Sequence, residues 1–175
     1  MIFKHIDGVS VKAVFMKENG TLFRYKLTIS KKGISEGGKT VCAIMQNPSV
    51  AGIEFADKSV QFLEKVIFTK GLKEFKGVIR LVIVNQFAKI QTNHFSGLTN
   101  EIGKKNDTCI KQALSDASII LIGWGKSKRH LERIEFVLRL VNDMSGKKIY
   151  VTKKHPSRGC YKGFILPYRA KRKIE

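Results

Sequence analysis

The sequence predicts a single α/β domain. We expect a three-layer sandwich with a short, mainly parallel sheet of four strands and an added N-terminal β-hairpin. Three observations predict this fold. Four short apolar runs alternate with helical patterns, each run ends at polar or glycine residues, and an Asn-Gly pair separates two β-rich segments near the N-terminus. A chain of 175 residues suits one domain and is long enough to form a hydrophobic core.

The N-terminal part carries the hairpin signal. Asn19-Gly20 lies between two alternating apolar runs, which predicts a hairpin over residues 9–30. A glycine-rich link follows at residues 33–38. We therefore expect residues 1–38 to form the hairpin and link, 39–166 to form the core of the domain, and 167–175 to form a basic tail.

From residue 40 onward, strands and helices alternate. The four predicted strands are 40–45, 78–84, 118–122 and 148–151. Apolar residues at helical spacing predict helices over 58–70, from an Asn106-Asp107 cap onward, and around 131–141. In such a parallel sheet, ligands bind at the carboxyl ends of the strands, so the functional residues should follow the strands.

The charge predicts a polyanionic partner. The chain has 33 Lys and Arg residues against 14 Asp and Glu residues, a formal net charge of +19 at pH 7. This excess creates self-repulsion, and its usual counterpart is the phosphate backbone of nucleic acid. We expect the partner to be DNA, double- or single-stranded, and the protein to be a monomer.

Other composition features indicate a cytoplasmic protein. The sequence has no apolar run near the ~20 residues needed to cross a bilayer and no signal-peptide core. Its cysteines Cys42, Cys109 and Cys160 lie far apart, so we expect no disulfide framework. The four histidines show no metal-ligand spacing. We therefore expect no membrane association, no metal and no cofactor.

Four polar segments directly follow the four predicted strands, and they should gather at one edge of the sheet. They are Asn47-Pro48-Ser49, Asn85-Gln86-Phe87, Gly123-Trp124-Gly125 and His155-Pro156-Ser157. In this order, they resemble motifs of the uracil-DNA glycosylase superfamily over residues 40–165. Met45 to Ser49 is similar to the motif that positions the attacking water, and Phe55 is placed like the aromatic residue that stacks on the extruded base. Asn85 resembles the residue that reads the edge of the base.

The chain is more closely similar to an uncharacterised bacterial and phage domain family. That resemblance rests on Asn47 to Ser49, Asp57, Asn85 to Ala88, Gly103 to Asp107, Trp124-Gly125 and His155-Pro156. It implies a fold and a site without a named reaction.

The glycosylase resemblance implies a DNA glycosylase that flips and excises a damaged or modified base. The implied catalytic residues are Asn47 or Asp57, which would activate the water, and His155, which would stabilise the departing base. The implied substrate-binding residues are Gln46, Ser49, Phe55, Asn85 and Ser157. The basic residues expected to bind DNA phosphates lie on the same strand-end loops: Lys126, Lys128, Arg129, Lys153, Lys154 and Arg158.

The sequence departs from the glycosylase pattern at several points. It lacks the glycine before Gln46, and no tyrosine follows Pro48 to block larger bases. This leaves room for a bulkier base, such as a modified cytosine of phage DNA, and the biological role could be repair or defence. A non-catalytic DNA-binding module on the same fold is the main alternative. A metal-dependent nuclease is disfavoured because the chain is poor in carboxylates.

Several of these residues also have a structural explanation. Asn47-Pro48 could form only a strand-end turn, and Asp57 is a natural N-cap for the helix that follows. Trp124 could serve in core packing, and the simplest role of Asn106-Asp107 is to cap a helix.

Overall fold

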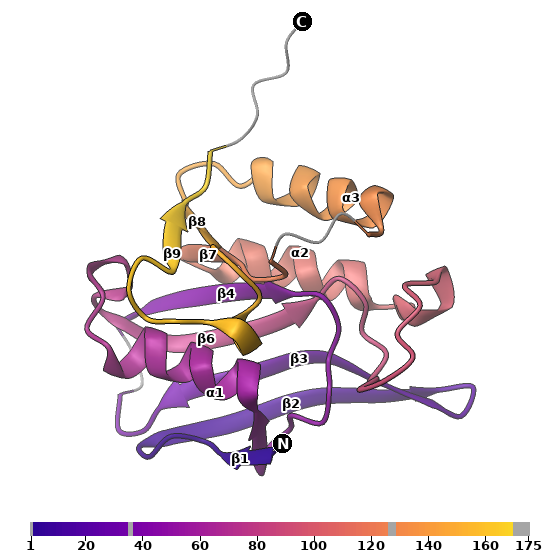
Figure 1. Cartoon of the computed structure of the whole chain (residues 1–175), viewed down its shortest axis with the longest axis horizontal. Helices are drawn as coiled ribbons and strands as arrows, with labels where there is room; N and C mark the ends of the chain where they lie inside the picture. The colour runs from indigo at the N-terminus through magenta and orange to yellow at the C-terminus, as the bar shows by residue number, and fades with distance from the viewer. Residues whose placement is uncertain (1, 35–36, 126–128, 170–175) are drawn as a thin grey trace, which may run out of the picture.

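In the computed structural model, residues 2–34, 37–125 and 129–169 are described. They form a seven-stranded mixed sheet and a separate two-stranded sheet (Figure 1). The large sheet has the order β2-β3-β6-β4-β7-β8-β9, and β1 pairs with β5 in the small one. The strands are β1 (Ile2–Lys4), β2 (Val9–Glu18), β3 (Thr21–Lys31), β4 (Lys39–Met45), β5 (Phe55–Asp57), β6 (Val78–Asn85), β7 (Ile119–Ile122), β8 (Lys148–Thr152) and β9 (Ile165–Pro167).

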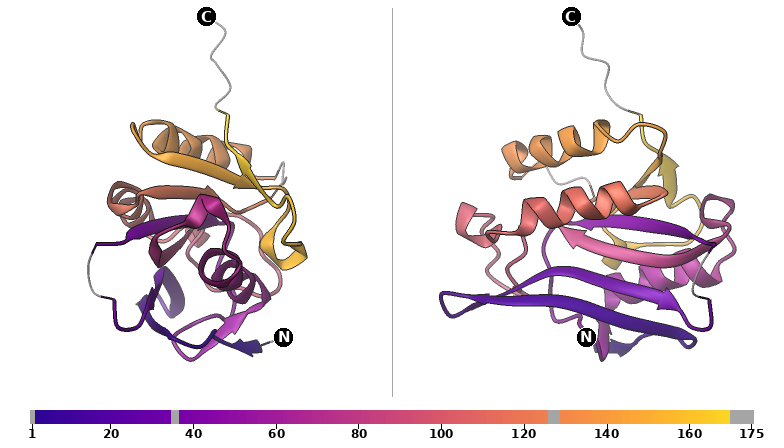
Figure 2. Two further views of the ribbon diagram at one scale, coloured as in Figure 1. Left: turned by 90° about the vertical axis from the view of Figure 1, so that its left-hand side faces the viewer. Right: turned by 180° about the vertical axis from the view of Figure 1, so that it is seen from behind.

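Helices cover both faces of the large sheet. The helix α1 (Lys58–Glu64), continued by the π-helical turn η1 (Lys65–Thr69), lies on one face, and α2 (Asn106–Asp116) and α3 (Leu131–Asn142) lie on the other (Figure 2). Along β4, Val41 and Ala43 pack on the α1 side, whereas Cys42 and Ile44 pack on the α2 and α3 side. Alternation along one strand therefore builds two apolar cores, because successive side chains point to opposite faces. Short 3₁₀ turns complete the chain: η2 (Lys73–Phe75), η3 (Thr99–Glu101) and η4 (Pro156–Arg158).

The four predicted parallel strands are confirmed as the centre of the sheet, in the order β6-β4-β7-β8. Their carboxyl ends therefore lie at one edge. The predicted hairpin is also confirmed, with β2 and β3 joined at Asn19-Gly20. Asn19 and Gly20 both have positive φ, as a two-residue hairpin turn of type I′ requires.

The expected sheet of four mainly parallel strands is wrong in size and composition. The hairpin is not an added element, because β3 pairs antiparallel with β6, with Leu27 opposite Ile83. Leu27 and Ile29 are fully buried, so this strand belongs to the core. At the other edge, β9 pairs antiparallel with β8. The strand β9 could not be predicted, because its three residues, which end in proline, are too few to show the alternation typical of a strand.

The small sheet ties the N-terminus to the segment that precedes α1. In it, Ile2 pairs with Asp57 and Lys4 pairs with Phe55. The next residue, His5, contacts a carboxylate oxygen of the buried Glu64 through Nδ1 and the carbonyl oxygen of Gly52 through Nε2 at 3.0 Å. Both partners are acceptors, so the ring binds both only as an imidazolium. Burial acts to lower the pKa of His5, but the hydrogen bond and charge of Glu64 raise it above 6.5 overall.

Candidate functional site

Two hollows meet at the carboxyl edge of the parallel strands. The smaller one, here called the inner cavity, has a volume of about 160 Å³. The larger one, here called the outer cleft, has a volume of about 740 Å³. His155 lines both of them. The polar lining of the inner cavity includes side chains from three of the four predicted strand-end segments, from the end of β5 and from β3. They are Asn47, Ser49, Asn85, His155, Asp57 and Arg24.

The segment after β4 is fixed by the loop that follows β6. The Asn47 side chain donates from Nδ2 to the carbonyl oxygen of Gln91 at 2.9 Å, and the Gln91 backbone donates to the carbonyl oxygen of Pro48 at 3.0 Å. The first of these bonds uses the donor end of the Asn47 side-chain amide, so its Oδ1 remains the acceptor that it can offer. Asn47 is thus more than a residue in a turn, and it lines the inner cavity.

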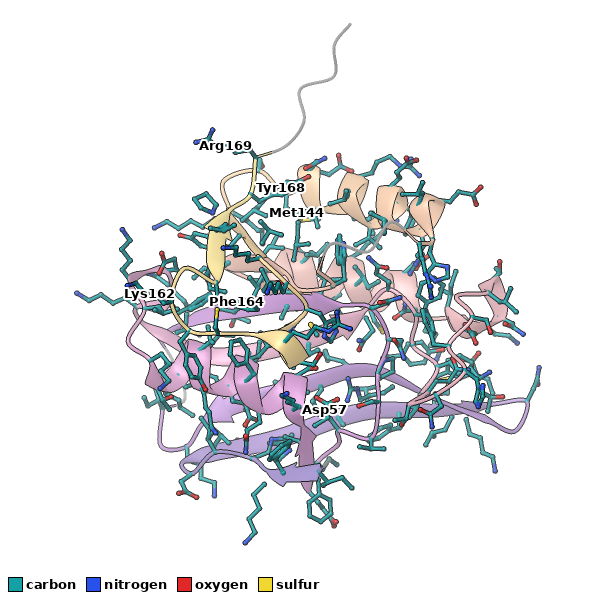
Figure 3. The ribbon with its side chains drawn as sticks, in the orientation of Figure 1. Asp57, Met144, Lys162, Phe164, Tyr168 and Arg169 are labelled. Carbon is teal, nitrogen blue, oxygen red and sulfur yellow. The ribbon has the colours of Figure 1, made fainter. Side chains whose placement is uncertain are left out.

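Asp57 has a structural role and a place in the cavity at the same time. It lies at the junction of β5 and α1 (Figure 3), where its Oδ1 accepts from the backbone N–H of Val60 at 2.8 Å and caps the helix. Its Oδ2 accepts from the hydroxyl of Ser49. The expected helix cap is therefore confirmed. A carboxylate has about four lone-pair sites, so each oxygen can still accept one more hydrogen bond.

The structure places one charged residue in the cavity that the sequence analysis missed. Arg24 of β3 is only 2% exposed, and its guanidinium donates to the carbonyl oxygen of Ala51 at 2.5 Å and to Oδ1 of Asn85 at 3.3 Å. Burial lowers the pKa of Arg24 to about 10, and the charge of Asp57 opposes this shift. The guanidinium therefore stays charged at neutral pH. Its Nε has no hydrogen-bond partner among the described residues.

The sequence contains one weak signal for Arg24, which is a charge between the aromatic residues Phe23 and Tyr25. Strand alternation would place it outside with Lys26. However, the register between β2 and β3 shifts at Val14 and Phe15, and the backbone N–H of Arg24 bonds to the carbonyl oxygen of Ala88 at 2.9 Å. Simple alternation therefore does not hold at this point of the strand, and the side chain of Arg24 is buried.

A second residue, which the sequence analysis assigned to a helix cap, supports the end of β6. Asn106 is fully buried and donates from Nδ2 to the carbonyl oxygens of Asn85 at 2.9 Å and Gln86 at 3.0 Å. The carbonyl oxygen of Gln86 also accepts from Nε of Arg133 at 2.8 Å, and Arg133 is paired with Asp107. The expectation that Asn106-Asp107 caps α2 is wrong, because no side-chain hydrogen bond caps this helix. The pair instead fixes the strand end that carries Asn85.

His155 is held in one tautomer by the turn that follows it. Its Nδ1 accepts from the backbone N–H of Ser157 at 3.3 Å and lies 2.9 Å from the Ser157 hydroxyl. The proton of the neutral ring is therefore on Nε2. Burial lowers the pKa of His155 below 6.5, the charge of Arg158 lowers it further, and the charge of Asp57 opposes both. The ring is thus a neutral donor at pH 7.

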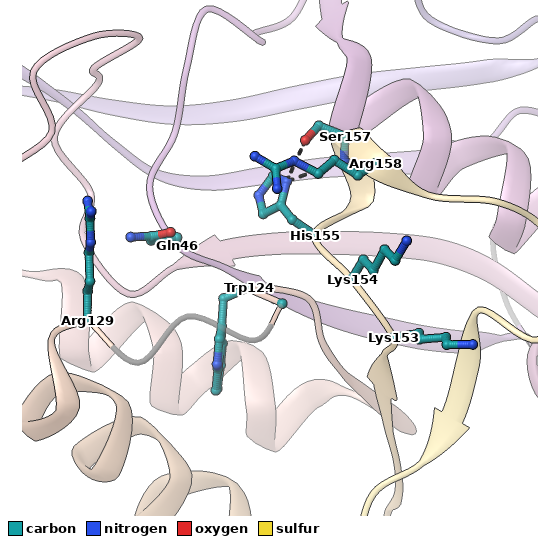
Figure 4. Close-up of a pocket in the computed structure, with 9 residues that line it drawn as sticks. Gln46, Trp124, Arg129, Lys153, Lys154, His155, Ser157 and Arg158 are labelled. Atoms are coloured by element: carbon teal, nitrogen blue, oxygen red, sulfur yellow. Dashed lines mark hydrogen bonds between the residues drawn. The ribbon is translucent and has the colours of Figure 1, made fainter.

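The outer cleft gathers positive charge. Figure 4 shows Arg129 on one side of it, Lys153 and Lys154 on the other, and Gln46 and Trp124 between them. Ser157 and Arg158 complete its polar lining. Trp124 is 6% exposed and packs in the core on the α2 and α3 side, so its expected packing role is confirmed. Lys126 and Lys128, also expected to bind phosphate, lie outside the described residues.

Phe55 does not lie where a base-stacking residue would be needed. It is 48% exposed and lines a separate surface hollow with Phe15 and Val50, and it does not line the inner cavity. The reason is the alternation of β5, in which Ala56 points into the core and its neighbour Phe55 points outward. Phe55 is therefore the one predicted base-binding residue that the structure places away from both hollows at the strand ends.

The described residues form neither a metal cluster nor a membrane-spanning helix. No three side chains of His, Cys, Asp or Glu group closely enough there to hold a metal ion. None of the helices in the described ranges combines the length and the apolar character that crossing a membrane requires.

Comparison with known proteins places the chain in a family. No curated protein and no solved structure was found to match it. The model of the family described as "Protein of unknown function (DUF1643)" matches residues 24–158, a range that runs from Arg24 to Arg158 and includes every inner-cavity residue discussed above. Nothing in these comparisons links the chain to the uracil-DNA glycosylase superfamily, so that resemblance stays a prediction. The match covers most of the chain, and the protein therefore belongs to this uncharacterised family, DUF1643.

Proposed function

We propose that this protein is a DNA glycosylase that takes one base into the inner cavity and hydrolyses its N-glycosidic bond. The observation that carries the proposal is the position of His155, which lines both hollows. A nucleotide with its phosphates in the outer cleft and its base in the inner cavity would have its glycosidic bond beside this ring.

The outer cleft is suited to a DNA backbone. Its lining includes Arg129, Lys153, Lys154 and Arg158 and contains no carboxylate among the described residues. Lys and Arg side chains that neutralise phosphates release counterions from DNA, and this release supplies much of the binding free energy. The net charge of +19 favours the same partner.

The inner cavity is suited to a single flipped base. Its volume of about 160 Å³ is well below the range typical of sites for drug-sized ligands, which begins at about 300 Å³. It offers hydrogen-bond donors and acceptors on several sides, as a site that reads the edge of a base must do. The donors include Asn85 and His155, and the acceptors include Asn47 and Asp57.

The chemistry requires a leaving base and an incoming water. When the bond between C1′ and the base nitrogen breaks, its electron pair leaves with the base and positive charge develops on the sugar. Nε2–H of His155 would donate a hydrogen bond to the departing base and stabilise its negative charge. Water would then add to C1′ and lose a proton to Asp57. Oδ1 of Asn47 would orient that water, since an amide cannot take up the proton.

One observation favours a non-catalytic binding module on the same site. Both carboxylate oxygens of Asp57 already have a structural partner, in Val60 and Ser49. Such a module would bind DNA and hold an extruded base without releasing it.

An assay of abasic sites separates the two functions. The protein would be incubated with EDTA on DNA that contains uracil, on plain DNA and on phage DNA with modified cytosine, and strand breaks would be counted after alkali. If the protein is a glycosylase, at least one of these substrates should show strand breaks that appear only after alkali. These breaks should be absent with the Asp57→Asn variant. Tight, salt-sensitive binding with no breaks on any substrate would instead indicate the binding module.

A further inference from the structure

Two donors in the wall of the inner cavity have no partner within the described parts of the chain. They are Nε of Arg24 and Nδ2 of Asn85. Both residues are 2% exposed and both line the cavity. A buried donor without a partner costs folding free energy, so unpartnered donors beside a cavity call for a hydrogen-bond acceptor, which a bound ligand or a water supplies.

The Asn85 amide can be oriented without ambiguity. The guanidinium of Arg24 contains only donors, so the Asn85 atom 3.3 Å from it must be the carbonyl oxygen Oδ1. A flipped amide would place two donors against each other. The main chain of Asn85 is also fixed, because its carbonyl oxygen accepts from Asn106 at 2.9 Å. The amide therefore offers Nδ2 as the donor that a ligand can meet.

We propose that Arg24 determines which base the cavity accepts, by holding the Asn85 amide in the orientation that selects a 4-oxo pyrimidine over a 4-amino one. This inference rests on the proposed function. A base of the uracil or thymine type presents an O4 acceptor, which Nδ2 of Asn85 meets, and an N3–H donor, which the second lone pair of Oδ1 can accept. Cytosine presents an amino donor at position 4, which would face the Asn85 donor.

The size of the cavity agrees with a single-ring base. A water molecule takes up about 30 Å³ of liquid, so the cavity corresponds to about five waters, on the order of one substituted six-membered ring. The sequence left a modified cytosine open as the substrate. A modified cytosine that keeps its 4-amino group is now disfavoured as the base that binds, whereas a 4-oxo base modified at another position is not.

Binding to DNA that resists cleavage tests the inference. Short single strands would carry one central 2′-fluoro nucleotide, which slows loss of the base, with uracil, thymine or cytosine at that position. A strand with an abasic tetrahydrofuran at the same position is the control. We expect the uracil and thymine strands to bind the full-length protein about ten-fold more tightly than the cytosine strand, since a well-formed pair of hydrogen bonds discriminates between bases by roughly five-fold to one hundred-fold.

Two variants test the role of Arg24 itself. In Arg24→Met the amide is free to turn, so we expect the ratio of uracil to cytosine affinity to fall to about one. In Asn85→Asp both side-chain oxygens are acceptors that Arg24 can pair, so this variant should fold even if Arg24→Met does not. It should shift the preference toward cytosine.

The outcomes separate the inference from the proposed function. If binding depends on the base but cytosine equals or exceeds uracil, the selection by Arg24 and Asn85 is wrong while a base-binding cavity remains. If all base-bearing strands bind no better than the abasic strand, no base enters the cavity, and the proposed function fails together with the inference.

Discussion

The hydroxyl of Ser49 donates a hydrogen bond to one carboxylate oxygen of Asp57, and the backbone of α1 binds the other. Ser49 follows β4 and Asp57 ends β5, so this bond joins two segments at the wall of the inner cavity. Asp57 thereby has a fixed position in the site, which a general base needs.

The two roles of Asp57 can be separated by substitution. Asparagine caps a helix about as well as aspartate, whereas alanine does not. We expect Asp57→Ala to lower the free energy of unfolding by about 1 kcal/mol and Asp57→Asn to change it by only a few tenths. Both variants should lose base release. Urea unfolding together with the abasic-site assay would check this, and an active Asp57→Asn variant would show that the carboxylate takes no proton.

The pKa values of His5 and His155 should lie on opposite sides of 6.5. The pKa of His5 is raised, so its stabilisation is complete below pH 6.5 and is lost as the pH rises through its pKa. The pKa of His155 is lowered, so its stabilisation is present above pH 6.5 and is lost as the pH falls through its pKa. NMR titration of the imidazole rings, assigned with His5→Gln and His155→Gln, measures both. Two titrations on the same side of 6.5 would contradict these assignments.

Loss of the Asn106 side chain should lower the free energy of unfolding more than loss of an exposed side chain on α2. Asn106→Ala removes both bonds to the carbonyl oxygens of Asn85 and Gln86 and leaves these buried acceptors with fewer donors. We expect a decrease of about 2 kcal/mol in the free energy of unfolding. The matched control is Gln112→Ala on the same helix, which removes an exposed bond to Asp116 and should cost about 0.5 kcal/mol or less. Equal decreases would show that Asn106 has no special role.

The cations of the outer cleft should set the salt dependence of DNA binding. A double substitution of Lys153 and Lys154 by Gln removes two of them. The slope of log Kobs against log salt is negative. We expect its magnitude to fall by up to about 0.9 for each DNA phosphate that the variant no longer neutralises. The control is the same charge change at Lys39 and Lys148, the exposed first residues of β4 and β8, at the opposite edge of the sheet. If the control substitutions reduce the magnitude of the slope equally, DNA does not bind preferentially in the cleft.

The sequence could predict the parts of the fold that have local signals. The turn at Asn19-Gly20 and the uninterrupted apolar run of β6 predict a hairpin and a buried strand directly. The pairing of β3 with β6 could not be predicted, because the partners are some fifty residues apart and their pairing leaves no local pattern. The pairing of β1 with β5 was missed for the same reason.

The candidate site was predictable where parallel topology positions its residues. Asn47 and His155 follow parallel strands and Asn85 ends one, so one rule brings all three to the same edge. Arg24 was missed because it comes from an antiparallel neighbour with a shifted register. The role of Asn106 was missed because asparagine at the start of a helix is typical of a cap, and only the tertiary hydrogen bonds of its side chain show a different role.

The most direct measurement of the proposed glycosylase activity is the release of free base. DNA with a single uracil, DNA with thymine at that position and DNA with a modified cytosine there would each be incubated with the protein, and the free base would be quantified by mass spectrometry. Abasic sites would be counted in the same samples. We predict one free base for each abasic site on a 4-oxo substrate, with the yield abolished in Asp57→Asn and strongly reduced in His155→Ala. Saturating binding to all three DNAs with no free base would contradict the proposal.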